Sequence, residues 1–380
     1  MATFEAVCDA FAKQAGYCDE HGSPFTARLL RGLMEGMREG EPALHTVAGW
    51  QGDPLADVLP LRVAGALHAL VLDGLAPTLA RLYPGGVGDH QDAQLKPASI
   101  SALASHPQVL AEYLAVPPQT NEVGRSAVLL GGFATIAAYT GLPLRLFELG
   151  ASAGLNMNWD RYRYRLGDGV IGDASSPLEL APLWHGPLPP SASIDVLART
   201  ACDCAPLNIS DAAQRQRLRS YVWADQSARQ QQLNAALDVA TRYPVQVEQA
   251  DAAEWLERML AAPLPGGIAT VIYHSIFWTY LSPDAQARIE SAIHLAGQHA
   301  TATAPLAWLR FEIADFQHPP RLLLSLWPGP GPQNVHLADA QAHGSEIFWH
   351  SDAAEALALT APRHGRSAAS LTICRFGESR

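Results

Sequence analysis

The residues best suited to chemistry lie in one short stretch, Glu148-Leu-Gly-Ala-Ser-Ala-Gly154. An apolar run that starts at Leu144 precedes it, and residues at helical spacing follow it. This pattern predicts a strand, a tight turn and a helix. No side chain between Gly150 and Gly154 is larger than that of serine, so a ligand could contact the bare backbone at the start of the helix. The stretch therefore predicts a binding loop for a small molecule.

The same loop fits a second chemistry. Gly150-x-Ser152-x-Gly154 is also the pattern of a nucleophile elbow, in which Ser152 would attack a substrate with Asp315 and His336 as partners. A nucleophile elbow follows several strands, however, and the residues upstream of Leu144 are predicted to be helical. A glycine loop after the first strand of a series is typical of doubly wound folds that bind a nucleotide cofactor.

Two further acidic residues follow predicted strands. A strand at 194–201 leads to Asp203, and a short alternating strand that starts at Val245 leads to Asp251. The carboxyl ends of parallel strands meet at one edge of a sheet, so Glu148, Asp203 and Asp251 should converge there. A carboxylate after the second strand can accept hydrogen bonds from ribose hydroxyls, and one after the third strand can accept from an adenine amino group. The pattern predicts an adenosine-containing ligand.

With these residues in place, the range 144–340 resembles class I S-adenosylmethionine-dependent methyltransferases. Glu148-x-Gly150-x-Ser152-x-Gly154 is similar to the first motif of that superfamily, with Ser152 where a middle glycine is usual. Three later segments are similar to the second, third and fourth motifs: Ala201-Cys-Asp-Cys-Ala-Pro, Gln249-Ala-Asp-Ala and Val271-Ile-Tyr-His-Ser-Ile-Phe-Trp-Thr-Tyr-Leu-Ser-Pro.

The resemblance implies a Rossmann-like fold and S-adenosylmethionine as cofactor. It places Asp203 at the ribose, and Asp251 and Ala252 at the adenine. The whole chain also resembles an uncharacterised bacterial family that shares this nucleotide-binding fold, which indicates no substrate. The acceptor of the methyl group is therefore expected to be a small molecule or a protein, and a non-catalytic binder of an adenosine ligand stays open as an alternative.

Methyl transfer from a sulfonium requires the protein mainly to orient donor and acceptor. If the acceptor must lose a proton, His274 at the end of the fourth predicted strand is the best placed base, although it could equally pack in the core. Tyr273, Ser275 and Trp278 beside it could line the acceptor pocket.

A polar segment before the predicted helix at 122–139 gives further candidates. Asn121, Glu122 and Arg125 could line one wall of the cofactor pocket, or they could simply cap that helix.

The order of predicted elements defines the architecture. Strands and helices alternate from residue 144, which predicts an α/β fold with a doubly wound, mostly parallel sheet. The fifth strand at 304–313 is followed by strands at 321–327 and 335–338, which would form an antiparallel hairpin at the edge.

We expect three regions along the chain. Residues 1–140 would form a helical region that covers the acceptor, and residues 141–350 a Rossmann-like domain with an insertion at about 162–190. Residues 351–380 would be a tail, with a possible edge strand at 371–376.

Composition limits the possible partners. A net charge of −11 argues against nucleic acid, whose binding depends on Lys and Arg. The start of the chain lacks a basic segment before an apolar run, and the apolar range 126–144 is predicted to be a buried helix, not a membrane span. We expect a cytoplasmic protein without a membrane contact.

No metal site is expected from the sequence. The five cysteines have no paired CxxC spacing, and Cys202 and Cys204 are predicted to be small buried hydrophobes. His336, His343 and His350 recur every seven residues, a spacing that should not bring side chains together along a hairpin and loop, so scattered surface histidines are expected.

Overall fold

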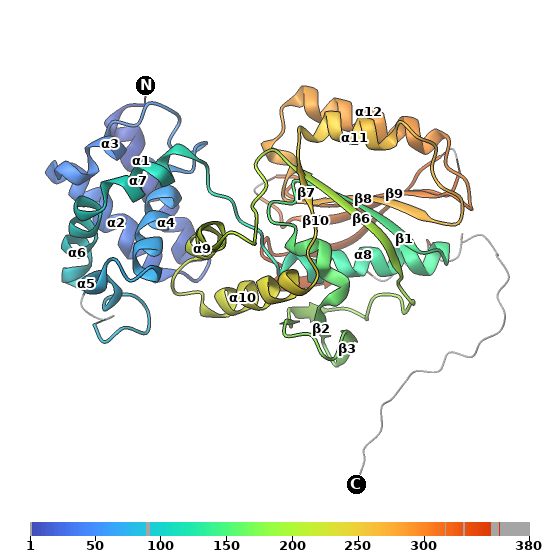
Figure 1. Cartoon of the computed structure of the whole chain (residues 1–380), viewed down its shortest axis with the longest axis horizontal. Helices are drawn as coiled ribbons and strands as arrows, with labels where there is room; N and C mark the ends of the chain where they lie inside the picture. Colours follow the sequence, from blue (N-terminus) through green and yellow to red (C-terminus); the bar gives the residue numbers. More distant parts are fainter. Residues whose placement is uncertain (1, 89–91, 316, 330, 351–356, 358–380) are drawn as a thin grey trace, which may run out of the picture.

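A computed structural model describes residues 2–88, 92–315, 317–329, 331–350 and 357 of the chain (Figure 1). It has an α/β fold preceded by a helical region, as predicted. The helical region comprises α1 (Phe4–Glu20), α2 (Pro24–Glu39), the 3₁₀-helix η1 (Pro42–Leu44), α3 (His45–Ala48), α4 (Leu59–Leu72), α5 (Pro77–Ala80), α6 (Asp92–Ser105) and α7 (Pro107–Ala115).

The α/β part follows this helical region. It comprises α8 (Arg125–Thr140), β1 (Leu144–Leu149), η2 (Leu155–Arg161), β2 (Arg163–Leu166), β3 (Gly169–Gly172), β4 (Glu179–Leu180), β5 (Leu183–His185), β6 (Val196–Asp203), α9 (Ala212–Ser220), α10 (Ser227–Arg242), β7 (Val247–Gln249), α11 (Ala252–Leu260), β8 (Ala269–Ser275), η3 (Trp278–Tyr280), α12 (Pro283–Gln298), β9 (Leu306–Glu312), β10 (Arg321–Trp327), β11 (Gln333–Ala340) and β12 (Glu346–Trp349).

The helical region has its own hydrophobic core. Its helices form because apolar residues recur at helical spacing: Phe25, Leu29, Leu33 and Met37 of α2 are four residues apart and all buried. Pro24 at the first turn and Gly40 in the left-handed conformation at the end set the limits of this helix.

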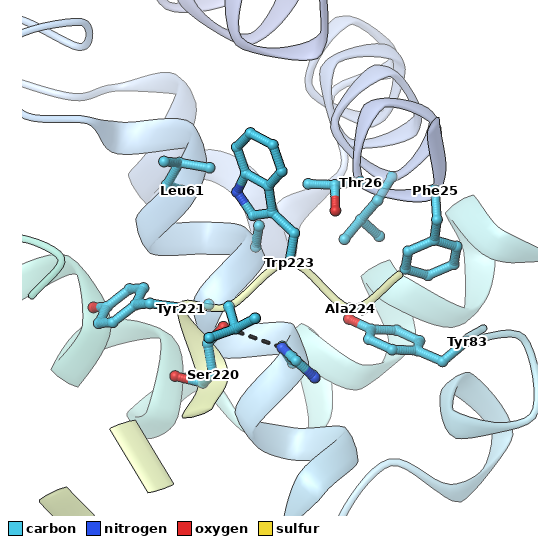
Figure 2. A pocket seen from close by; sticks show the side chains of 13 residues that line it. Phe25, Thr26, Leu61, Tyr83, Ser220, Tyr221, Trp223 and Ala224 are labelled. Atoms are coloured by element: carbon cyan, nitrogen blue, oxygen red, sulfur yellow. Dashed lines mark hydrogen bonds between the residues drawn. The ribbon is translucent and has the colours of Figure 1, made fainter. Parts of the chain in front are cut away.

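A segment from the α/β part completes that helical core. α9 and the residues after it lie against α4, where Tyr221 is buried among the helices and Trp223 packs at the edge of the same core. Figure 2 shows that Ser220, Tyr221, Trp223 and Ala224 line a small cavity together with Phe25, Leu61 and Tyr83 of the helical region. The two parts therefore share one packed interface.

The large sheet has nine strands in the order β5-β12-β11-β10-β9-β8-β1-β6-β7. Its strands β9, β8, β1, β6 and β7 pair in parallel, and β10 and β11 continue it as the predicted antiparallel hairpin. The order reverses between β1 and β8, because the chain first builds outward through β6 and β7 and then returns to the other side of β1. In doubly wound folds, ligands bind outside the carboxyl ends of the strands at such a switch point.

Helices cover both faces of the sheet. α11 and α12 lie on one face and α8 and α10 on the other (Figure 1). β8 is buried from Ala269 to His274, as its continuous apolar run predicts for a strand covered on both faces. α8 falls within the range expected for the helical region, but its buried side chains belong to the core of the sheet.

The insertion after the glycine loop forms a small sheet and the outer edge of the large one. β2 pairs antiparallel with β3 and parallel with β4, while β5 pairs with β12 at the end of the large sheet. The sequence does not predict β5 or β12. The expected strand at 371–376 lies outside the described residues.

Among the described residues, the structure contains no helix of the length and apolar character needed to cross a membrane.

Candidate ligand-binding site

The glycine loop lies at the carboxyl end of β1, directly at the switch point. Glu148 is paired with Ala201 of β6 on one side and with Tyr273 of β8 on the other. Gly150, Ser152 and Gly154 all adopt left-handed backbone conformations, with φ values of 68°, 53° and 71°. Left-handed conformations at every second residue of the loop turn the chain sharply between β1 and η2. The helix predicted after the loop is a kinked 3₁₀-helix and not a regular α-helix.

Close packing explains the two glycines. A Cβ on Gly150 would lie 2.1 Å from Cδ2 of Phe277, and a Cβ on Gly154 would lie 2.7 Å from Cγ2 of Val245. Side chains from the segment after β8 and from the segment before β7 therefore contact the two ends of the loop. Larger residues at either position would push these neighbours apart.

Asp203 holds the loop from the end of β6. Its Oδ2 accepts a hydrogen bond from the Ser152 N–H at 2.8 Å, and its Oδ1 accepts one from the Ala205 N–H at 2.9 Å. Asp251 follows the neighbouring strand β7, and its Oδ1 caps α11 by accepting from the Ala253 and Glu254 N–H groups.

The structure brings the predicted acids together. Glu148, Asp203 and Asp251 lie at the ends of the neighbouring strands β1, β6 and β7, and Asp203 is paired with Gln249, two residues before Asp251. Ala252 is buried in the first turn of α11. Their roles toward a ligand stay predictions.

Glu148 is buried beneath the loop. Its Oε2 accepts a hydrogen bond from the Tyr273 hydroxyl at 2.9 Å. Burial, opposed by the Tyr273 hydrogen bond and aided by the nearby Asp203 carboxylate, raises the pKa of Glu148 to about 8. Glu148 is therefore mostly protonated at neutral pH in the ligand-free protein.

The segment before α8 crosses the carboxyl ends of the strands. Asn121 Oδ1 accepts a hydrogen bond at 2.8 Å from the N–H of Leu155, the first residue of η2. Arg125 donates to the Ser275 carbonyl at the end of β8, with Nη1 2.9 Å from that oxygen. Two of the predicted wall residues thus contact the start of η2, directly after the glycine loop, and the end of β8.

Glu122, the third predicted wall residue, belongs to a buried network of charges. It pairs with Arg229 of α10, and its Oε2 lies 3.2 Å from Nδ1 of His343. Burial alone would raise the pKa of Glu122, but Arg229, His343 and Arg125 outweigh it and hold the pKa at about 2. The carboxylate is ionised and joins the segment before α8 to α10 and to the loop after β11.

His274 faces the side of the sheet that α12 covers. Its Nδ1 lies 2.6 Å from Oε1 of Glu312, and its Nε2 accepts a hydrogen bond from the Trp308 indole N–H at 3.1 Å. The ring of Trp278 stacks on it. Both ring nitrogens are thus engaged within the protein, so His274 could act as a base only after the bond to Trp308 is broken.

Glu312 is a site residue that the sequence analysis missed. In addition to His274, its carboxylate accepts hydrogen bonds from the N–H groups of Phe277 and Trp278, at 3.0 and 3.2 Å. It thereby holds the loop after β8, in which Ile276 has a φ of 46°, a strained value for a β-branched residue. Glu312 ends β9, so an acid at the end of the fifth strand was the available signal.

The residues of the predicted nucleophile elbow are not assembled into a triad. The Ser152 hydroxyl is buried and has no hydrogen-bond partner among the described residues. Asp315 lies against His318 instead, and His336 lies against Asp339.

A cavity of about 570 Å³ lies where the helical region meets the α/β part. Arg229, His343 and Gly124 line it from the charged network and the segment before α8, and Glu20 and His21 line it from the end of α1. Pockets between domains are common sites for substrates.

The expectation of scattered histidines is wrong for two of the three. His336 and His350 both contact the carboxylate of Asp339, while His343 lies in the network around Glu122.

Comparison with known proteins identifies the family of the chain. No curated protein and no solved structure matches it. Residues 8–349 match the model of a family described as uncharacterized proteins conserved in bacteria (DUF2332), and because this match spans most of the chain, the protein belongs to that family.

Proposed function

We propose that the protein binds S-adenosylmethionine at the carboxyl ends of β1, β6 and β7 and transfers its methyl group to a small molecule or a protein. One observation carries the proposal: a glycine loop at the switch point of a doubly wound sheet, with carboxylates at the ends of three neighbouring strands. The bound cofactor would supply the reactive methyl group.

The residues present fit such a ligand. Each carboxylate oxygen of Asp203 receives a close backbone hydrogen bond, and a carboxylate offers about four acceptor positions, so capacity remains for ribose hydroxyls. The capping bonds of Asp251 use Oδ1, which leaves Oδ2 to accept from an adenine amino group. The buried Ser152 hydroxyl, which lacks a partner within the described residues, would gain one from the ligand.

Glu148 would respond to the positive charge of the cofactor. A cation beside a buried carboxyl favours its ionised form, so binding would lower the raised pKa of Glu148 and release a proton. The affinity should therefore rise with pH up to about pH 8.

The neighbouring residues would orient the acceptor. Glu312 fixes the loop after β8 through the Phe277 and Trp278 N–H groups, and Arg125 fixes the end of β8 through Ser275. The cavity between the helical region and the α/β part is wide enough for a small molecule. Glu20 and His21 at the end of α1 line it, so the helical region would cover the bound acceptor. We assign His274 a positioning role, because its ring stacks on Trp278 and so helps to hold the loop after β8. It would remove a proton from the acceptor only after its hydrogen bond with the Trp308 indole N–H is broken.

The test is calorimetric titration of the purified protein with S-adenosylmethionine. Asp203→Ala should abolish binding, because it removes the ribose acceptor and releases the Ser152 N–H. Ser152→Ala should lower the affinity less than about tenfold, since one neutral hydrogen bond contributes about 0.5–1.5 kcal/mol. Asp211→Ala, which removes a carboxylate that only caps α9, is the matched control and should bind normally.

Two results would overturn the proposal. The first is the absence of any binding or melting-temperature shift at millimolar S-adenosylmethionine. The second is covalent labelling of Ser152 by a fluorophosphonate together with loss of activity in Ser152→Ala, which would indicate a serine hydrolase.

A further inference from the structure

Two histidines and one aspartate meet in the antiparallel part of the large sheet, away from the glycine loop. His336 and Asp339 belong to β11, and His350 follows β12 directly. The His350 N–H donates to the Leu337 carbonyl at 2.8 Å, which fixes His350 beside β11.

A β-bulge brings these side chains to one face. Residues three apart point to opposite faces in a regular strand. In β11, however, Ala338 pairs with Leu322 and His336 with Leu323, so Leu337 is an extra residue. The extra residue restores His336 and Asp339 to the same side of the sheet.

The three side chains already converge. His336 Nε2 lies 3.1 Å from Asp339 Oδ1, and His350 Nε2 lies 2.9 Å from Asp339 Oδ2. The two imidazole rings have centroids 4.7 Å apart at an angle of 67°. One ligand atom from each residue falls within 4.8 Å of the other two.

We propose that His336, Asp339 and His350 bind a divalent transition-metal ion, with Zn²⁺ the best fit. Two imidazoles and one carboxylate form a donor set suited to zinc, and hard ions such as Mg²⁺ and Ca²⁺ prefer sites built only from oxygen. Bond lengths of about 2.0–2.2 Å to a tetrahedral zinc ion place its ligand atoms roughly 3.3 Å apart. The observed separations need only small side-chain rotations to reach this value.

The surroundings indicate an accessible site of moderate affinity. The side chains of His336, Asp339 and His350 are 38%, 25% and 39% exposed, so an ion can enter and water can occupy the fourth position. Arg321 Nε lies 3.9 Å from Asp339 Oδ1 and offsets part of the negative charge. We therefore expect a dissociation constant in the micromolar range.

The bound ion would join β11 to the chain after β12. β12 also pairs with β5 of the insertion, so the ion would strengthen the outer edge of the sheet. Zinc should therefore raise the melting temperature of the protein as well as bind to it.

The experiment uses the full chain without an affinity tag, after removal of metal by a chelator. Titration with Zn²⁺ should show one equivalent bound, and Co²⁺ in its place should give the visible absorption of a tetrahedral site. His350→Ala and Asp339→Asn should each weaken zinc binding at least tenfold and remove the melting-temperature shift. His318→Ala is the control, because His318 lies 2.8 Å from Asp315 in another His–Asp pair of the surface, which is more exposed and has no second histidine against its carboxylate.

The proposal fails if His350→Ala binds zinc as the unchanged protein does, or if His318→Ala loses binding to the same extent. Circular dichroism of each variant without metal shows whether the fold is intact, and His350→Gln provides a second variant if His350→Ala does not fold. None of the three ligands belongs to the glycine-loop site, so S-adenosylmethionine binding should be unchanged in these variants.

Discussion

Glu148 is a buried carboxyl group of the glycine-loop site whose pKa is raised. The residue is only 2% exposed, and its carboxyl group accepts a hydrogen bond from the Tyr273 hydroxyl. The pKa of about 8 means that the folded protein keeps a proton that the unfolded chain loses above about pH 4.5. Folding therefore holds this acid in its neutral form across the physiological range.

This difference predicts how stability depends on pH. Between about pH 4.5 and pH 8 the folded state binds more protons at this site, so the free energy of unfolding should fall as pH rises and level off above pH 8. Glu148→Gln stays neutral, so its stability relative to the unchanged protein should increase over this range by a few kcal/mol. Urea denaturation of both proteins at about pH 5 and about pH 8 measures this difference in the free energy of unfolding.

Glu290→Gln, on the exposed face of α12, is the matched control for replacing a glutamate by glutamine. Parallel stability curves for Glu148→Gln and the unchanged protein would contradict the prediction.

The sequence predicts the location of a residue well where that residue directly ends a predicted strand. Glu148, Asp203 and Asp251 each end a predicted strand, so a doubly wound order alone brings them to one edge. The meeting of His336 with Asp339 depends on the extra residue Leu337, and hydrophobic patterning contains no signal for that bulge.

At the level of elements, α8 shows how small residues allow a helix to pack closely against a sheet. Gly131 and Gly132 let it approach closely: a Cβ on Gly131 would lie 2.3 Å from Cζ3 of Trp349, and one on Gly132 would lie 2.3 Å from Cδ1 of Leu309. Glycine is usually unfavourable within a helix. Here the close contact accounts for both residues.

Two glycines in helices should therefore respond in opposite ways to alanine. Gly131→Ala should lower the free energy of unfolding by about 1–3 kcal/mol, because the rigid and buried Trp349 ring leaves no room for a methyl group. Gly16→Ala in α1 should raise it by roughly 0.5–1 kcal/mol, because nothing lies within 4 Å of the added Cβ. Chemical denaturation of both variants tests this, and a stabilised Gly131→Ala would show that α8 packs more loosely.

Elements with strong local patterns were predictable from the sequence. β8, β9 and β10 are seven-residue strands made mainly of apolar residues, and α12 begins after Ser282, whose hydroxyl accepts a hydrogen bond from the Ala285 N–H. β5 has only three residues, none of them fully buried, and it is defined by pairing with β12 about 160 positions later. Such a strand depends on the assembled sheet and has little pattern of its own.

At the level of the whole molecule, the interface between the helical region and the α/β part rests on the segment after α9. Tyr221 completes the core of the helical region, and the Ser220 carbonyl accepts a hydrogen bond from His68 of α4 at 3.1 Å. The sequence predicted the helices on both sides but not this contact, because its partners lie about 150 positions apart. The interface also borders the cavity proposed for the acceptor, which His21 and Arg229 line. The packing of the helical region against the α/β part therefore helps to shape the proposed acceptor site.

Asp225 provides the sharpest test of this connection. Its Oδ2 accepts a hydrogen bond at 2.9 Å from the N–H of Phe25, and its Oδ1 accepts one from the Ser23 hydroxyl. Ser23 makes no capping bond to α2 itself, so the start of that helix is capped by a residue 200 positions away. Asp225→Ala should cost about 2–4 kcal/mol, since two hydrogen bonds to a charged group are lost.

The loss should also change how the molecule unfolds. The helical core and the sheet core are separate, so weakening their contact should split a single thermal transition into two. Asp211→Ala, which removes a cap within α9 alone, should cost about 1 kcal/mol and leave one transition. If calorimetry shows a single, equally cooperative transition for Asp225→Ala, the two parts are joined chiefly by apolar packing around Tyr221.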